Sequence, residues 1–269
     1  MTTTPHSRSW LITGVSGGIG RALAQQVLAR GDTVWGSLRQ AGQQAAFEAL
    51  APGRAFALAM DVTDAAQVQT GVARVLANGP LDVLVNNAGF GMVGAVEETS
   101  LAEARAVMET NFFGLLQVTQ AVLPALRAQR RGHIVNLSSG VGLSALPGMP
   151  IYSASKHAVE GLSEALAGEV AALGIRVSLV EPGAVLTNFT GGAMLEAAQR
   201  LPDYAAVSGH GRAGLDHYYQ QQAASPDDVA RAIVALVDDP QPPLRTVVGL
   251  DVQASVRARH AAWQALIRD

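Results

Sequence analysis

The hydrophobic positions of the chain fall into short β-branched runs that alternate with longer stretches rich in alanine and leucine. Short apolar runs are typical of strands buried on both faces, and the longer stretches are typical of helices that cover a parallel sheet. The sequence therefore predicts an α/β fold, a doubly wound seven-stranded parallel sheet with helices on both faces. The predicted strands are Trp10 to Thr13, Thr33 to Ser37, Ala55 to Met60, Val83 to Asn86, His133 to Leu137, Arg176 to Val180 and Thr246 to Leu250.

Glycine residues mark the ends of two predicted helices. The first helix extends from Ile19 to Ala29 and ends before Gly31. The second extends from Ile151 to Leu173 and ends at Gly174. Glycine best tolerates the left-handed conformation of a helix C-cap, so both segments are expected to be helices that return the chain to the next strand.

The segment 188–224 differs from the rest of the chain because it has several glycines, three tyrosines and weak periodicity. Ser225 follows it as the predicted N-cap of a helix that continues through Val237. Doubly wound sheets bind ligands beyond the carboxyl ends of their strands, so we interpret 188–224 as a substrate lid after the sixth strand; a surface excursion is the alternative. The predicted organisation is a single domain over 1–269, with a cofactor-binding and catalytic core at about 8–187, the lid at 188–224, and a C-terminal helix, last strand and tail at 225–269.

The composition excludes several classes of protein. Of the 269 residues 49% are hydrophobic and 15% are charged, and the formal net charge is -3. A nucleic-acid-binding protein would carry a basic excess, and a disordered chain would contain fewer apolar residues. The chain has no Cys, which excludes disulfides, thiolate nucleophiles, iron–sulfur clusters and Cys-ligated zinc, and which is compatible with a reducing cytoplasm.

Targeting segments, membrane spans and metal sites are not expected. The first nine residues are polar, and no run approaches the roughly 18 apolar residues that a membrane span requires. His210 and His217 lie seven residues apart, a spacing that does not place them on one helix face as a metal pair. We therefore expect a cytoplasmic protein that has no metal, no membrane contact and no nucleic-acid partner.

A glycine-rich turn lies between the first predicted strand and the first predicted helix. Gly14 permits the tight turn, Gly18 lets the backbone approach a pyrophosphate, and Gly20 permits close packing of the helix on the strand. The N-terminus of the helix then faces the anion. This context predicts a dinucleotide site, and a tight turn that binds nothing is the alternative. The candidate contacts are Gly14, Ser16, Gly17, Gly18, Ile19 and Gly20.

The end of the second predicted strand bears on the choice of cofactor. An enzyme that prefers NAD would place Asp or Glu here to bind the ribose 2′-hydroxyl, and neither is present. Arg39, together with Ser37, is instead suited to a 2′-phosphate through charge-assisted hydrogen bonds. The expected cofactor is therefore NADP(H), with NAD(H) as the second choice; a solvated surface side chain is the alternative for Arg39.

Tyr152 and Lys156 carry the candidate chemistry. Of the 19 basic residues 18 are Arg, and Lys156 is the single Lys. Their spacing of four residues places the phenol and the ammonium on one face of the predicted helix. At about 4 to 5 Å and an effective dielectric constant near 20, the ammonium would stabilise the phenolate by roughly 3 to 4 kcal/mol and lower the pKa of the phenol. Tyr152 is thus predicted to act as general acid in reduction and general base in oxidation.

Further motifs stand in order along the chain and resemble those of one enzyme family. They are the glycine turn, Asn86 to Gly89 after the fourth strand, Asn111, Ser139, Tyr152 with Lys156, and Pro182 to Thr187 after the sixth strand. With them the chain resembles the classical short-chain dehydrogenases/reductases over nearly its whole length. Residues 86–100 and Pro242 to Arg245 are similar to the subgroup of 17β-hydroxysteroid and retinol dehydrogenases. The resemblance implies a single-domain Rossmann fold and hydride transfer between a nicotinamide cofactor and a carbonyl or alcohol.

The resemblance also implies roles for individual residues. Ser139 would stabilise the substrate oxygen beside Tyr152, and adjacent Ser138 competes for this role. Asn111 would bend its helix and orient a water in a proton relay, with a buried or capping amide as the alternative. Lys156 would also hold the nicotinamide ribose. The implied cofactor contacts are Tyr152, Lys156, Asp61 and Val62 at the adenine, Asn87, Ala88 and Gly89 along the cofactor, and Pro182, Gly183, Val185 and Thr187 at the nicotinamide; for Asp61 a strand-end cap is a role that can coexist.

Apolar side chains near the expected site favour a hydrophobic ketone or aldehyde as substrate. The candidates are Leu143, Pro147, Met149, Phe189 and Met194, with Tyr204, Tyr218 and Tyr219. The sequence thus predicts an NADPH-dependent carbonyl reductase that acts reversibly as an alcohol dehydrogenase. The alternatives are an NAD-linked alcohol dehydrogenase of the same family and a non-catalytic NADPH-binding sensor. The resemblance further implies a homodimer or homotetramer.

Overall fold

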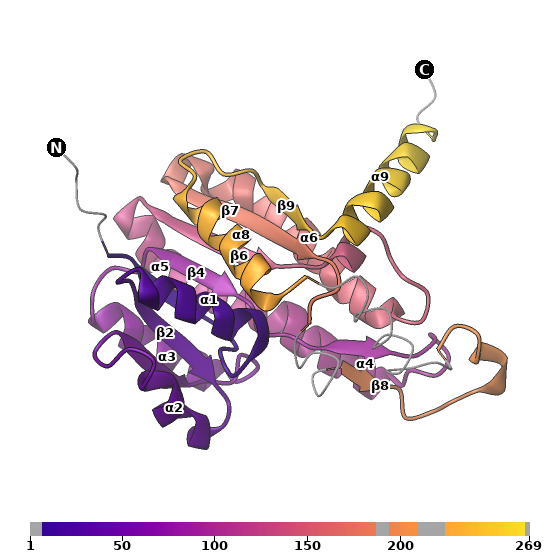
Figure 1. Ribbon diagram of the computed structural model, residues 1–269, viewed down its shortest axis with the longest axis horizontal. Helices are drawn as coiled ribbons and strands as arrows, with labels where there is room; N and C mark the ends of the chain where they lie inside the picture. The colour runs from indigo at the N-terminus through magenta and orange to yellow at the C-terminus, as the bar shows by residue number, and fades with distance from the viewer. Residues whose placement is uncertain (1–6, 187–193, 209–223, 267–269) are drawn as a thin grey trace.

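The strands that the sequence predicts form one parallel sheet in the computed structural model, which describes residues 7–186, 194–208 and 224–266 (Figure 1). The strands are β1 (Ser9–Ile12), β2 (Thr33–Leu38), β3 (Ala55–Ala59), β4 (Val83–Asn86), β6 (Gly132–Leu137), β7 (Ile175–Pro182) and β9 (Arg245–Val248). Their order in the sheet is β3-β2-β1-β4-β6-β7-β9, so the chain winds outward in both directions from β1 and β4. The predicted Rossmann fold with a seven-stranded parallel sheet is confirmed.

Helices cover both faces of this sheet (Figure 1). The main helices are α1 (Gly18–Ala29), α3 (Ala65–Ala77), α5 (Leu115–Gln129), α6 (Pro150–Val170) and α8 (Pro226–Asp238), and the shorter ones are α2 (Gln44–Glu48) and α4 (Leu101–Met108). α1 and α8 pack on one face, whereas α3, α5 and α6 pack on the other. Trp10 and Ile12 of β1 point to the first face and Leu11 to the second, and all three are fully buried. Each such side chain stabilises the fold by about 1.5 to 3 kcal/mol.

The predicted helix ends are found where glycine and capping residues place them. α6 continues through a 3₁₀ turn (Ala171–Leu173) and ends at Gly174, whose φ of 73° is left-handed. Ser225 and Asp228 form a capping box at α8, with the Ser225 hydroxyl accepting from the Asp228 amide at 3.1 Å. α1 begins at Gly18, one residue before the predicted start. Within the described ranges, every helix is too short or too polar to span a bilayer.

The C-terminal region differs from the prediction. β9 ends at Val248 rather than Leu250, because Gly249 has a φ of 119° and turns the chain into α9 (Leu250–Gln264). The sequence had indicated only a tail here. α9 projects away from the sheet, and Val252 in its first turn is the residue that the helix buries (Figure 1). A helix with so little apolar contact has no hydrophobic stripe for a sequence pattern to detect.

A second, two-stranded parallel sheet lies outside the main one. It pairs β5 (Gly91–Val93) with β8 (Met194–Glu196), and Met92 lies opposite Leu195. Strands of three residues are too short to show alternation, so no hydrophobic pattern predicts them. Through this pair the described part of the predicted lid is joined to the body of the domain, and residues 187–193 and 209–223 lie outside the described residues.

Two carboxylates attach the segment 194–208 to the body of the domain: Glu98 lies in the loop before α4, and Glu103 lies in α4 itself. Glu98 accepts hydrogen bonds from the Leu201 amide at 2.9 Å and from the Ser208 hydroxyl at 2.5 Å, and Glu103 accepts one from the Ala198 amide at 2.9 Å. These donors favour the ionised form, and they lower the pKa of Glu98 to about 2, with the Leu201 amide as the largest cause. The segment is therefore fixed to the domain by ionic hydrogen bonds.

Candidate active site

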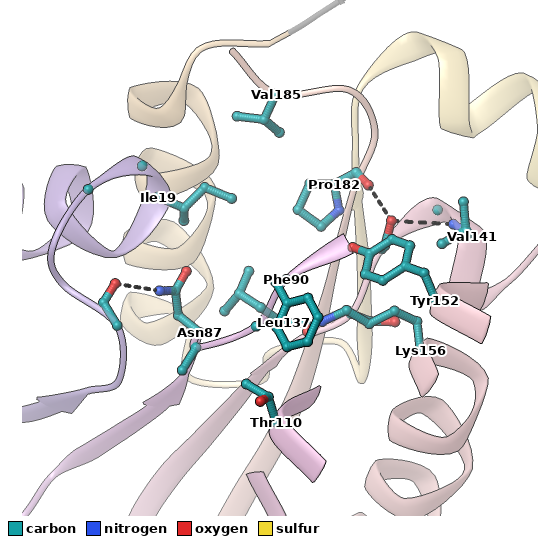
Figure 2. Close-up of a pocket in the computed structure, with 18 of the residues that line it drawn as sticks. Ile19, Asn87, Phe90, Thr110, Leu137, Val141, Tyr152, Lys156, Pro182 and Val185 are labelled. Carbon is teal, nitrogen blue, oxygen red and sulfur yellow. Dashed lines mark hydrogen bonds between the residues drawn. The ribbon is translucent and has the colours of Figure 1, made fainter. Parts of the chain in front are cut away.

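The carboxyl ends of the central strands open into a cavity of about 1130 Å³ (Figure 2). The predicted site residues that line it are Gly14, Ser16, Gly17, Gly18, Ile19, Ser37, Arg39, Asp61, Val62, Asn87, Ala88, Gly89, Ser139, Met149, Tyr152, Lys156, Pro182, Gly183 and Val185. Those that lie away from its wall are Gly20, Asn111, Leu143, Pro147, Met194 and Tyr204. Thr187, Phe189, Tyr218 and Tyr219 lie outside the described residues. The structure thus brings together most of the predicted site.

The glycine turn is held by hydrogen bonds from two neighbouring strands. Gly14 has a φ of 73°, and its amide donates to the Ser37 hydroxyl at 2.9 Å. The Asn87 side-chain amide donates to the carbonyls of Thr13 at 2.8 Å and Gly14 at 3.0 Å (Figure 2). A Cβ on Gly20 would lie 2.4 Å from the Gly14 carbonyl oxygen, so a side chain there would push the helix off the turn. The positive φ at position 14 and the lack of room for a Cβ at position 20 explain why both residues are glycine.

The N-terminus of α1 is open toward the cavity. Gly17 is the N-cap residue, and no side chain in the described part of the chain caps the first amides of the helix. A Cβ on Gly17 would have no atom within 4 Å, which shows free space beside the turn. Unpaired amides and the helix dipole attract an anion. The turn and the open helix end therefore fit the pyrophosphate of a dinucleotide.

Side chains at the ends of β2 and β3 lie where the adenosine half of a dinucleotide would reach. Ser37 is buried and already accepts from Gly14, whereas Arg39 is exposed at the cavity edge. Asp61 accepts from the Thr63 amide at 3.0 Å and from the Thr63 hydroxyl at 2.9 Å. Asp61 therefore forms the strand-end cap that the sequence suggested and also lines the cavity.

α6 is positioned by a buried polar network. The Asn86 side-chain amide donates to Asn136 and to Thr119, both at 2.9 Å, and the Asn136 amide donates to Ser163 of α6 at 2.8 Å. Buried polar groups of this kind are costly unless paired, so the network fixes one arrangement of α5 and α6 on β4 and β6. The result is a fixed position for Tyr152, three turns earlier on α6.

Tyr152 and Lys156 project from α6 into the same cavity (Figure 2). Lys156 Nζ lies 5.8 Å from the centre of the Tyr152 ring and donates to the Leu137 carbonyl at 2.8 Å. Burial lowers the pKa of Lys156 to about 8, and the negative charge of Glu160 opposes the shift. At neutral pH Lys156 is therefore mostly an ammonium, as its predicted role requires.

Ser139 and Ser138 differ in their surroundings. Ser139 is the N-cap of a 3₁₀ turn (Gly140–Gly142), and its hydroxyl accepts from the Val141 amide at 3.4 Å and donates to the Pro182 carbonyl at 3.5 Å. These long bonds leave the hydroxyl able to reorient. The Ser138 hydroxyl is buried against Gly142, where a Cβ would come within 2.6 Å of it. This difference favours Ser139 as the donor to a substrate.

Asn111 lies behind the cavity wall. It sits in a π-helical turn (Glu109–Gly114) between α4 and α5, a feature at which helices commonly bend. Its side chain accepts from the Phe90 amide at 3.0 Å and donates to the Phe90 carbonyl at 2.9 Å and to the Ser155 hydroxyl at 3.1 Å. The amide thus ties the backbone after β4 to α6, and a part in a proton relay stays a prediction.

The cavity has lining residues that the sequence did not indicate. Asp251, Val252 and Ser255 come from α9, and Phe90 and Thr110 also line the cavity. The sequence had assigned the region after Leu250 to a tail, so it gave no reason to place side chains there. Among the described residues, no group of three or more acidic or histidine side chains is arranged to hold a metal ion.

A buried pair of carboxyl groups lies one helical turn beyond Lys156. Glu160 of α6 is 6% exposed and Glu181 of β7 is 0% exposed. Arg245 contacts Glu160 at 2.9 Å, and Glu181 accepts from the Thr246 amide at 2.9 Å. Burial, followed by the charge of Glu160, raises the pKa of Glu181 to about 8. One cation beside two buried acids leaves Glu181 protonated at neutral pH.

Replacing Glu181 by glutamine is expected to stabilise the protein more as the pH rises. The folded-state pKa of about 8 lies above the ordinary value of 4.5, so the stability from this group is complete below about pH 4.5 and is lost as the pH rises to about 8. At pH 8 the variant should be more stable by on the order of 3 kcal/mol, and at pH 5 the two proteins should agree within about 1 kcal/mol. Thermal unfolding across this range measures the difference.

Glu164→Gln is the matched control for this change. Glu164 binds the same arginine, Arg245, at 2.6 Å, but its side chain is 63% exposed. The control should therefore show no growing stabilisation between pH 5 and pH 8. A difference between Glu181→Gln and the parent protein that stays constant over this range would contradict a protonated Glu181.

The comparison with known families decides what kind of protein carries this cavity. The model of the short chain dehydrogenase family matches residues 8–196. The chain belongs to that family. As a short-chain dehydrogenase it is an oxidoreductase that acts on CH–OH and C=O groups.

Individual relatives of this short-chain dehydrogenase are similar over most of their length. The 3-ketodihydrosphingosine reductase of Bacteroides thetaiotaomicron is 38% identical over 255 residues, which cover 94% of this chain and 91% of that protein. Retinol dehydrogenase 8 of Homo sapiens is 37% identical over 257 residues, which cover 88% and 80%. A short-chain dehydrogenase/reductase from Burkholderia phymatum in complex with NAD superposes with a TM-score of 0.86 at 26% identity, covering 99% and 98%. The predicted similarity to the retinol and hydroxysteroid dehydrogenase subgroup is confirmed.

Proposed function

We propose that the protein is an NADPH-dependent carbonyl reductase that acts on hydrophobic ketones or aldehydes and, in reverse, on the corresponding secondary alcohols. The observation that carries this proposal is the placement of Tyr152 and Lys156 in one cavity with the open N-terminus of α1. A sensor that only bound the dinucleotide would need the helix end and no buried phenol–ammonium pair. Reaction chemistry is therefore the function that the whole cavity supports best.

Three side chains of the cavity have different roles in the proposed reduction. When bound in this cavity, a nicotinamide cofactor would supply hydride for the carbonyl carbon. Tyr152 donates its phenolic proton to the carbonyl oxygen, and Lys156 stabilises the phenolate that remains. The hydroxyl of Ser139 donates to the same oxygen as negative charge develops on it. In oxidation the phenolate of Tyr152 takes the proton back from the alcohol.

The region around the turn would hold the cofactor itself. The amides of Gly17 and Gly18 would bind the pyrophosphate, and Arg39 would bind the 2′-phosphate of NADP. Lys156 has further donors beyond its bond to Leu137 and would hold the nicotinamide ribose. Pro182 to Val185 would bind the nicotinamide end. NADP is proposed over NAD because no carboxylate follows β2 within the cavity lining.

Replacing Arg39 by aspartate is expected to reverse the cofactor preference. The change removes a cation from a 2′-phosphate and supplies an acceptor for a 2′-hydroxyl. We expect the ratio of kcat/KM for NADPH to that for NADH to fall by roughly thirty-fold or more, since a hydrogen bond to a charged group contributes about 1.5 to 3 kcal/mol. Steady-state kinetics with both cofactors measure the ratio.

Arg127→Asp serves as the control for the change in net charge. Arg127 lies on an exposed turn of α5 and is not part of the cavity lining. Its substitution should leave the ratio of the two cofactors within about two-fold. A ratio that also stays unchanged in Arg39→Asp would remove the main argument against NAD-linked alcohol oxidation.

The proposed substrate class rests on the apolar side of the cavity. Met149, Val141, Leu146 and Leu195 line it, and the first two pack in the same apolar cluster as Tyr152. The names of the two relatives, a 3-ketodihydrosphingosine reductase and a retinol dehydrogenase, denote large apolar substrates. A panel of short polar and long apolar ketones, assayed with NADPH and with NADH, tests the proposal. Turnover of the apolar ketones with NADPH is the expected result, and turnover confined to polar ketones would refute it.

Two further properties of the protein are proposals of the same kind. We propose a cytoplasmic location, with which the absence of Cys is compatible. We also infer a homodimer or homotetramer, and Phe113 in the π-helical turn, which is 48% exposed, is an apolar group that such an assembly would cover. Light scattering on the purified protein determines the assembly.

A further inference from the structure

The first turn of α9 contacts both loops that border the reacting end of the cavity. Asp251 accepts from the Ala184 amide at 3.1 Å. Val252 is 5% exposed, and a Cβ on Gly140, next to Ser139, would lie 2.6 Å from its methyl group. The first turn of α9 therefore packs against both the turn after β7 and the loop that contains Ser139.

The Asp251 carboxylate occupies space that two glycines leave open. A Cβ on Gly183 would lie 2.3 and 2.4 Å from the two carboxylate oxygens, and a Cβ on Gly249 would lie 2.6 Å from one of them. The Gly183 amide also donates to the Val248 carbonyl at 2.8 Å. The turn from Pro182 to Ala184 is thus held from one side by the end of β9 and from the other by Asp251.

The rest of α9 makes little contact with the domain core. Beyond the first turn the helix is largely exposed, and Leu250, which precedes Asp251, is 82% exposed. Asp251, Val252 and Ser255 are the residues of the helix that face the cavity. A helix that stabilises the fold buries an apolar stripe along its length, whereas α9 contacts the cavity through its first turns alone.

We propose that Asp251 is a positioning residue that holds the turn Pro182–Val185 against the nicotinamide half of the cofactor. The proposal rests on the proposed function, because that turn is assigned there to the nicotinamide. The carboxylate accepts a charge-assisted hydrogen bond from the Ala184 amide and fills the space beside Gly183. Without it the turn keeps its backbone hydrogen bonds to Val248 and Ala224 but loses its contact with α9, so its position against the cavity is less tightly fixed.

The test compares binding of the whole cofactor with binding of its adenosine half. Asp251→Ala should weaken NADPH binding by roughly ten-fold, the loss expected for one hydrogen bond to a charged group. Binding of 2′-phospho-ADP-ribose, which lacks the nicotinamide, should stay within about two-fold, because Arg39 and the glycine turn are untouched. Calorimetry measures both dissociation constants on the protein without turnover. The kcat should fall as well, because a displaced nicotinamide transfers hydride poorly.

Asp227→Asn is the matched control. Asp227 lies in the first turn of α8, where it also faces a helix N-terminus, but its carboxylate is exposed and contacts Gln26. If Asp251 acted only through its own helix dipole, both changes would affect stability alike and neither would affect the cofactor. Asp251→Asn, which preserves the shape of the side chain, covers the case in which the alanine variant does not fold, and it should weaken NADPH binding by a smaller factor.

The outcomes separate this inference from the proposed function. Equal weakening of NADPH and of 2′-phospho-ADP-ribose, or no change in either, overturns the positioning role of Asp251. A parent protein that binds neither ligand overturns the proposed function instead. Selective weakening of NADPH by both Asp251 variants, with Asp227→Asn unchanged, supports the inference.

Discussion

Replacing Tyr152 by phenylalanine is expected to lower kcat by about a thousand-fold while leaving the dissociation constant for NADPH within about two-fold. The change removes the hydroxyl and keeps the ring. That ring packs with Val93, Met149 and Met194 in a small apolar cluster, so the fold and the cavity should persist. The loss of the proton donor in reduction, and of the base in oxidation, then shows directly in turnover.

The size of this effect follows from what remains in the cavity. In the proposed mechanism Ser139 would still donate to the substrate oxygen and Lys156 would still carry its charge, but neither would replace the proton of the phenol. General acid catalysis by a placed side chain is worth about 10² to 10⁴ in rate. Steady-state assays in both directions measure the loss, and circular dichroism and NADPH titration report the fold and the cofactor site.

Tyr204→Phe is the matched control for this substitution. Its hydroxyl donates to Glu97 at 2.7 Å and lies away from the cavity wall, so the same chemical change should leave kcat within about two-fold. Substantial turnover in Tyr152→Phe, with Tyr204→Phe also active, would show that another group delivers the proton.

Replacing Lys156 by arginine should lower kcat by roughly a hundred-fold, although the charge is conserved. Lys156 is 6% exposed, and its ammonium donates to the Leu137 carbonyl at 2.8 Å. A planar guanidinium is larger and directs its donors differently, so it cannot occupy this position beside both the phenol and the ribose.

The kinetic pattern of Lys156→Arg distinguishes this loss from simple unfolding. Because the same ammonium is assigned to the ribose, KM for NADPH should rise while kcat falls, and both effects should appear in a variant that still unfolds cooperatively. Arg127→Lys is the reverse change at an exposed site and should be silent. Wild-type turnover in Lys156→Arg would mean that any cation suffices and that the single lysine of the chain is a coincidence.

Local features of the sequence were enough to predict the sheet and most of the cavity. The central strands are short and largely apolar because both of their faces are buried, and such a run can be read from the sequence without knowing which strands lie beside it. The glycine turn was predictable because a positive φ at Gly14 and a close approach at Gly20 leave few other residues acceptable. Tyr152 and Lys156 were found because their spacing is fixed by one helix.

Features that depend on distant contacts could not be predicted. The pairing of β5 with β8 involves three residues on each strand, and the attachment of 194–208 depends on Glu98 and Glu103, whose donors lie far along the chain. α9 was missed because its one buried side chain, Val252, gives no periodicity. For the same reason Asp251 was not among the predicted site residues. The apolar character of Leu143 and Met194 predicted that both would line the cavity, but neither does. Met194 is instead buried in the apolar cluster that contains Tyr152.

The small parallel sheet joins two parts of the cavity wall that are far apart in the sequence. β5 begins directly after Phe90, its partner strand β8 contains Leu195, and both side chains line the cavity. Leu195 pairs with Met92, two positions after Phe90, so the two lining residues lie close together on one hydrogen-bonded ladder. A ligand that displaces Leu195 is therefore expected to shift the backbone beside Phe90 as well.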